Sequence, residues 1–186
     1  MTTRLTPKCI ADGPTLTRPE PASCVPVSCP LTLPAGYWVE GKSWRLTLAG
    51  KISSSNLDAL RMLNVPSGFA RYDLRLGGVV AWDSGEIALN SSGDFTNVPW
   101  SLTVELTCRA IGSAATLIGV GVFACADLDG ASTSPPKAGG VIVVPVTAPA
   151  VGATFDSFAE LQVGVFSASR YATGSRTVQQ YSIEEI

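Results

Sequence analysis

The chain has 186 residues, of which 46% are hydrophobic and only 15% are charged, and its formal net charge is −2. This length suits a single domain that buries a full core without disulfide or metal staples. Nucleic-acid binding requires a basic patch that neutralises phosphates, and the thirteen Lys and Arg residues form no run, so we expect no nucleic-acid partner. The charged share lies below the roughly 25% of an average soluble protein. It indicates either a surface partly covered by other subunits or a neutral β domain.

The sequence contains no clear segment for membrane insertion or export. Its longest apolar runs, residues 114–126 and 141–151, are shorter than the roughly 20 residues of a membrane-spanning helix. No charged lead followed by an apolar segment is found at the N-terminus, so no secretory signal is predicted. We therefore expect no membrane partner and synthesis in the cytoplasm.

Residues 1–36 are predicted to form an extended arm. Seven of the thirteen prolines lie there, and proline resists both helices and central strands. Apolar residues are nevertheless spread through the segment, so it should lie along a surface, either of its own domain or of a neighbouring subunit. These apolar anchors are the candidate capsid or subunit interface: Leu5, Ile10, Leu16, Val25, Val27, Leu31 and Leu33.

The pattern changes after residue 37. Trp44, Leu46 and Leu48 alternate with more polar neighbours, which is typical of a strand with one buried face. Residues 53–56 are predicted to end this strand. Residues 57–65 form the one helix candidate, and it is weak.

A hairpin is predicted next. Apolar and charged residues alternate over residues 72–76, Gly77 and Gly78 supply a two-residue turn, and residues 79–82 return as the partner strand. Residues 87–89 are predicted to form a further short strand.

The clearest pattern lies at residues 97–125. One side of the first strand is apolar and consists of Trp100, Leu102, Val104, Leu106 and Cys108. After a break at residues 111–113 the chain is apolar again over residues 115–126, which predicts two long strands joined by a tight turn. A hairpin alone cannot bury its apolar face, so the rest of the chain must supply the other wall of the core.

The remaining residues continue the β pattern. Residues 127–140 are rich in Gly, Pro, Ser and Asp and are predicted to form a loop, and residues 141–146 are β-rich. Alternation at residues 161–166 predicts another strand. Residues 167–175 are expected to turn, and residues 177–186 to form a final strand.

These segments together predict an all-β fold with two regions. Residues 1–36 are the extended, proline-rich arm. Residues 37–186, with eight or nine strands and almost no helix, should form an antiparallel, jelly-roll-like β-sandwich.

Catalytic groups are scarce. The chain has no histidine, which excludes Ser-His-Asp and Cys-His sites within one chain. Two close carboxylate pairs remain for glycoside chemistry, Asp127 with Asp129 and Asp83 with Glu86. Acids in such loops usually accept backbone hydrogen bonds, and the first pair lacks the further acids of a calcium loop. We expect no enzymatic activity, no cofactor and no metal.

The five cysteines leave one over from any full set of disulfides. Cys24 and Cys29 are close enough in sequence for a small loop to join them, and Cys108 and Cys125 lie in the predicted hairpin, where a free thiol behaves as a small apolar group. No Cys-x-x-Cys pair is present to suggest zinc. Reduced thiols are the expectation.

The four tryptophans have two interpretations. Trp38, Trp44, Trp82 and Trp100 either fill the core and plug the ends of the sandwich, which we favour, or form a platform that stacks on sugars.

Several motifs resemble a group of virion structural proteins of tailed bacteriophages. Residues 37–50 (YWVEGKSWRLTLAG) are similar to the aromatic-x-x-Gly-Lys-x-x-Arg-x-x-x-x-Gly run that opens the β domain in that group. Residues 74–78 (LRLGG), residues 96–102 (TNVPWSL) and residues 106–109 (LTCR) with Gly112 are similar to its later strands. The resemblance covers roughly residues 37–125 and the final strand.

The resemblance implies a capsid decoration or minor capsid protein, often a homotrimer, that lies on the capsid surface of the virion. Its partner would be the major capsid protein, which it would cement against the pressure of packaged DNA. The alternative is a tail-associated or receptor-binding β-sandwich that binds host surface glycans. A jelly-roll glycoside hydrolase ranks last because no well-placed carboxylate pair is predicted.

Overall fold

The computed structural model describes most of the chain. The described residues are 3–4, 11–17, 20–55, 69–89, 95–126, 140–147, 151–170 and 173–186. They contain strands and connecting turns and no helix, which confirms the all-β prediction. The helix candidate at residues 57–65 and residues 127–139 of the predicted loop lie outside the described residues.

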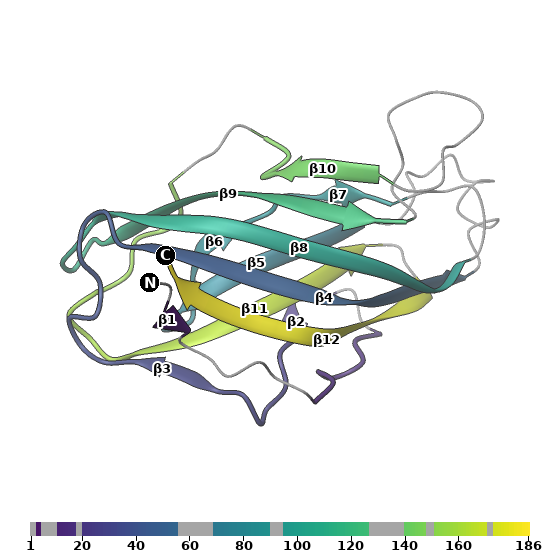
Figure 1. Ribbon diagram of the computed structural model, residues 1–186, viewed down its shortest axis with the longest axis horizontal. Coiled ribbons are helices and arrows are strands. Elements are labelled where there is room, and N and C mark those ends of the chain that lie inside the picture. The colour runs from purple at the N-terminus through teal and green to yellow at the C-terminus, as the bar shows by residue number, and fades with distance from the viewer. Residues whose placement is uncertain are drawn as a thin grey trace.

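Two antiparallel sheets pack face to face (Figure 1). Sheet A has the order β1 (Thr3–Arg4), β12 (Thr173–Glu185), β4 (Ser43–Ser55), β8 (Phe95–Ala110), β9 (Thr116–Cys125) and β10 (Gly140–Val144). Sheet B has the order β2 (Ala22–Ser23), β11 (Leu161–Arg170), β5 (Phe69–Leu76) and β6 (Val79–Asp83). In addition, β3 (Leu31–Leu33) pairs with β11, and β7 (Ile87–Ala88) pairs with β5.

The described residues contain twelve strands rather than the eight or nine predicted. β7 corresponds to the short strand predicted at residues 87–89. The additional strands, β1, β2 and β3, are only two or three residues long, and segments this short carry no period that a sequence pattern reveals.

The central hairpin is confirmed. β8 and β9 pair from Trp100 opposite Cys125 to Ala110 opposite Thr116. The five apolar residues predicted to share one side of β8 are each at most 4% exposed. Gly77 and Gly78 form the predicted turn between β5 and β6, both with positive φ (57° and 87°), as a type I′ hairpin requires.

Two strand ends differ from the prediction. β4 does not stop at Ser53 but continues to Ser55, where it pairs with Thr173 at the start of β12. β11 extends to Arg170, so the turn predicted at residues 167–175 is much shorter. The serines there read as loop residues, but pairing with neighbouring strands satisfies their backbone groups and overrides their weak strand propensity.

Aromatic side chains from both sheets fill the core. The ring of Tyr72 in β5 lies 4.9 Å from Trp100 in β8 and 5.7 Å from Phe123 in β9, between centroids. Trp82 in β6 donates its indole N–H to the Gly119 carbonyl oxygen of β9 at 3.2 Å. A Cβ at Gly119 would lie 2.8 Å from Trp82 Cδ1, so the absence of a side chain permits this close approach.

Described parts of residues 1–36 lie against the sheets of the same chain. β2 and β3 both pair with β11, and Leu16 exchanges two backbone hydrogen bonds with Arg176 of β12. Of the two surfaces considered for this segment, its own domain is the one that these residues cover (Figure 1).

Substitutions in this segment test how much it contributes to the fold. Leu33→Ala should lower the free energy of unfolding by about 2–5 kcal/mol, because Leu33 is only 2% exposed and packs in the core. Val27→Ala is the matched control, since Val27 is 93% exposed, and it should change that free energy by less than about 0.5 kcal/mol. Chemical denaturation measures both, and equal losses would contradict this account.

Candidate interaction surface

The outer face of β9 and β10 carries a strip of exposed aliphatic side chains, which we call the valine face. Its members are Val120 (46% exposed), Val122 (43%), Val141 (70%) and Val143 (60%). In the sheet register Val143 lies opposite Val122, and Val141 lies opposite Ala124. These side chains are therefore neighbours on one surface rather than scattered apolar residues.

The sequence of β9 explains why this face forms. Leu117 and Phe123 point into the core and are fully buried, while Ile118, Val120 and Val122 alternate with them and point outward. A strand that is apolar on both sides is typical of strands covered on both faces. The described residues cover only one face of β9, and on the other face Val120 and Val122 remain exposed.

The valine face ends at polar residues on the neighbouring strands. Thr103 and Glu105 of β8 lie opposite Val122 and Val120, and Glu105 pairs with Arg45 of β4 at 2.7 Å. A hollow of about 360 Å³ lies at this boundary, lined by Glu105, Thr107, Ile118, Gly119 and Val120. The apolar strip thus has a polar rim on one side, as protein interfaces commonly do.

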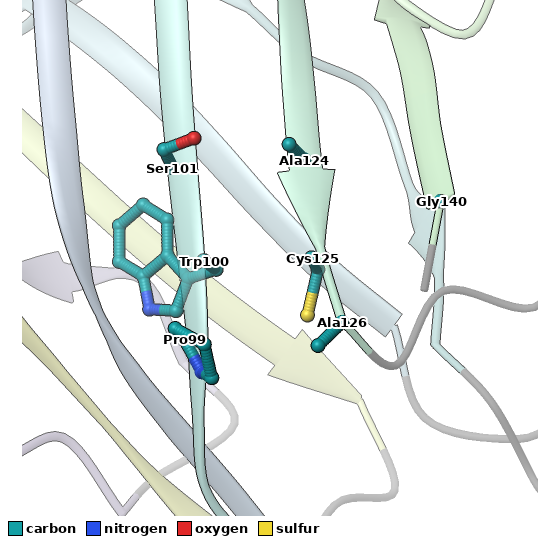
Figure 2. A pocket seen from close by; sticks show the side chains of 7 residues that line it. All are labelled: Pro99, Trp100, Ser101, Ala124, Cys125, Ala126 and Gly140. Atoms are coloured by element: carbon teal, nitrogen blue, oxygen red, sulfur yellow. The ribbon is translucent and has the colours of Figure 1, made fainter. Parts of the chain in front are cut away.

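A second hollow, of about 390 Å³, lies where the end of β9 and the start of β10 come next to β8 (Figure 2). It is lined by Pro99, Trp100, Ser101, Ala124, Cys125, Ala126 and Gly140. None of these seven residues is a carboxylate or a cation. The described lining of the hollow is therefore made of apolar and small side chains.

Two carboxylates of sheet B serve structural roles. Asp83, one of the predicted turn acids, accepts hydrogen bonds from Arg71 Nε at 2.9 Å and from the Gly85 amide at 2.9 Å. Asp73 is only 4% exposed and pairs with Arg75, whose Nε lies 2.7 Å from Oδ1. No group of three or more metal-binding side chains occurs within the described part of the chain. Asp127 and Asp129 lie outside it.

All four tryptophans are buried, each at most 4% exposed. The interpretation as core residues is therefore correct for all of them. A sugar-stacking platform made of these rings is excluded, because none presents a face to solvent.

The candidate interface residues of the N-terminal segment divide into three groups. Leu33 is buried, and Leu16, Val25 and Leu31 are partly buried against the core. Val27 is exposed. Leu5 and Ile10 lie outside the described residues. Four of the seven anchors are thus occupied at least partly by contacts within the chain.

The valine face was missed as a site, although the continuous apolar run at residues 115–126 was its signal. That run was interpreted only as the second strand of a hairpin. Sequence alone does not say which of its two apolar faces meets the core.

The cysteines differ from the expectation in one case. Cys24, Cys108 and Cys125 are free thiols, as expected, and no disulfide joins Cys24 to Cys29. Cys29, however, is disulfide-bonded, so the prediction that all the thiols are reduced is wrong at this position.

No protein-family model matches the chain, and a search of curated proteins finds no significant match. Among the described residues, no helix has the length and apolarity to span a membrane.

The buried thiol of Cys24 provides a pH test of the packing between the N-terminal segment and β11. Burial raises the pKa of this thiol to about 12, and its Sγ donates to the Val165 carbonyl oxygen at 3.3 Å. The thiol ionises near pH 9 in the unfolded chain but not in the folded one, so stability is full below pH 9 and falls between pH 9 and 12.

Cys24→Ala should therefore flatten the decline of the unfolding free energy above pH 9 by about 1.4 kcal/mol per pH unit. Denaturation at a series of pH values measures both slopes. Parallel curves for the two proteins would mean that Cys24 is not buried as described.

Proposed function

We propose that the protein is a structural subunit of a tailed-bacteriophage virion that decorates or cements the capsid by binding major capsid protein subunits. The observation that carries this proposal is the valine face, a cluster of exposed aliphatic side chains on regular strands, which is typical of a protein-binding surface. The sequence resemblance to phage virion proteins is the reason for naming a capsid as the assembly that this surface binds.

The energetics favour a repeated contact over a single one. Full burial of an exposed valine contributes about 1.5–3 kcal/mol, so four valines that are roughly half exposed contribute about 3–6 kcal/mol. The loss of translational and rotational freedom costs about 4–15 kcal/mol and offsets most of this gain. One copy therefore binds weakly, whereas a homotrimer on a symmetric shell gains strength from avidity.

The motif at residues 37–50, which resembles one in phage virion proteins, supports a structural role, because its residues stabilise the fold. Tyr37 donates its hydroxyl to Glu185 at 2.7 Å and accepts the Trp44 indole N–H at 3.0 Å. Lys42 lies 3.8 Å above the Tyr37 ring and 3.6 Å from Glu185. This cluster joins the segment before β4 to the end of β12.

The proposal includes the class of β-sandwich to which the fold belongs. We assign the two-sheet arrangement to the jelly-roll class, with β8 and β9 as its central hairpin and residues 1–36 as an extension. Glycan binding at the tail is the weaker candidate, because the four tryptophans that sequence reasoning offered as a platform are buried.

Binding to particles that lack the subunit tests the function. Val122→Lys places a charge in the centre of the valine face and should reduce occupancy at least tenfold, equivalent to about 1.4 kcal/mol per copy. Gln162→Lys adds the same charge at an exposed position on β11 in sheet B and should leave occupancy unchanged. Co-sedimentation with capsids measures both.

Capsid binding that is equally strong for the two variants would exclude the valine face as the attachment surface. Binding of the unaltered protein to tails and not to heads would exclude capsid decoration.

A further inference from the structure

We propose that β10 pairs with β10 of a second copy of this chain, antiparallel and about a two-fold axis at Ile142, so that two A sheets become one continuous sheet. This names a partner for the sheet edge next to the valine face and thereby extends the proposed function, on which its role in assembly rests. It is tested on the purified protein, so its outcome is separate from that of capsid binding.

β10 is the terminal strand of sheet A, paired with β9 on one side (Figure 1). No strand among the described residues pairs with its other side. Edge strands present unpaired N–H and C=O groups, and proteins normally protect them with lysine, proline, bulges or a covering segment.

β10 lacks these protections. Its sequence is Gly140-Val141-Ile142-Val143-Val144, with no charge and no proline, and its register with β9 has no bulge. The facing edge of sheet B is different. β6 is covered by the backbone of residues 151–153, where the Ala153 amide donates to the Val80 carbonyl oxygen at 3.2 Å. Within the described ranges no backbone segment covers the free side of β10, so of the two it is the edge open to a partner.

The sequence of β10 is compatible with itself in an antiparallel pair. Centred on Ile142, the pairing places Val141 opposite Val143 of the second copy and Gly140 opposite Val144. A charge on a strand that pairs with its own copy meets a like charge at or near the axis, which is unfavourable. β10 carries none, so no such repulsion arises.

Self-pairing also continues the exposed surface. Val141 and Val143 both point to the outer side, where Val122 and Ala124 of β9 extend the strip. Across the axis the same four residues of the second copy follow in reverse order. The two valine faces therefore form one continuous apolar surface twice as wide. Capsid subunits would bind this joint surface as a single site.

The size of the contact predicts a weak dimer. Five paired residues span about 17 Å of edge, and a five-residue edge buries much less than the roughly 1,200–2,000 Å² of a stable interface. The dimer should therefore form at high protein concentration and dissociate on dilution. This contact has two-fold symmetry, whereas a trimer has three-fold symmetry. The two can coexist, because the two-fold contact occupies only the β10 edge of sheet A and leaves the other surfaces free for trimer contacts.

The first experiment is sedimentation velocity of the purified full chain over a wide concentration range. The unaltered protein should shift reversibly to a species of twice its mass, or to paired trimers. Val143→Lys, at a 60%-exposed position, should abolish the shift. Val120→Lys adds the same charge to the valine face on β9, beyond the residues that pair with β10, and should leave the shift intact.

Thermal unfolding checks that both variants remain folded. An unaltered protein with no two-fold step at any concentration overturns the proposal. Loss of association in Val120→Lys, with or without loss in Val143→Lys, indicates packing between faces and also overturns it.

A second experiment tests the register. In the proposed pair the two copies of residue 142 lie directly opposite, with Cβ atoms about 4.5–5.5 Å apart, close to the range of a disulfide. Under mild oxidation Ile142→Cys should cross-link into dimers, whereas the two copies of residue 141 are diagonal and Val141→Cys should cross-link far more slowly. Equal or reversed rates would overturn the two-fold axis at Ile142.

Discussion

The two sheets meet closely where Trp82 of β6 lies against Gly119 of β9, and this contact depends on the absence of a side chain at Gly119. A Cβ at Gly119 would lie 2.5 Å from Leu106 and 2.8 Å from Trp82, so a side chain there would push the sheets apart. β9 therefore contributes little bulk to the core at this point, and the indole from β6 fills the space. The valines of β9 stand on the opposite side of the strand. The same constraint that closes the core thus leaves an aliphatic surface outside it.

Sequence reasoning recovered the features that depend on local periodicity. The strands around Trp44, Tyr72 and Trp100 were correctly identified because each alternates buried and solvent-facing side chains. Features that depend on distant partners were not recovered. β2 and β3 exist only because β11 offers them an edge, and proline-rich flanks conceal them. The valine face was overlooked because a strand that is apolar on both sides does not reveal which side meets the core.

The scarcity of charge has a structural counterpart. Several charged groups on the sheets are paired within the chain, including Arg71 with Asp83, Arg75 with Asp73 and Arg45 with Glu105. Arg176 is only 5% exposed and donates to the Ser169 hydroxyl at 2.7 Å inside the sandwich. A charge that is paired with an opposite charge in the same chain contributes little to the long-range electrostatic attraction of a binding partner. Recognition by this protein should therefore depend on shape and apolar contact and show little sensitivity to salt.

The position of β12 has a consequence for the timing of folding. β12 lies between β1 and β4, and Ile183 is paired with Leu46, a contact that spans most of the chain. Sheet A can acquire this inner strand only after residues 173–185 have left the ribosome. Until then one edge of β4 stays open, and nascent chains made side by side are exposed to mispairing. Products of premature termination cannot complete sheet A, so a complete sandwich requires that translation has reached the last strand.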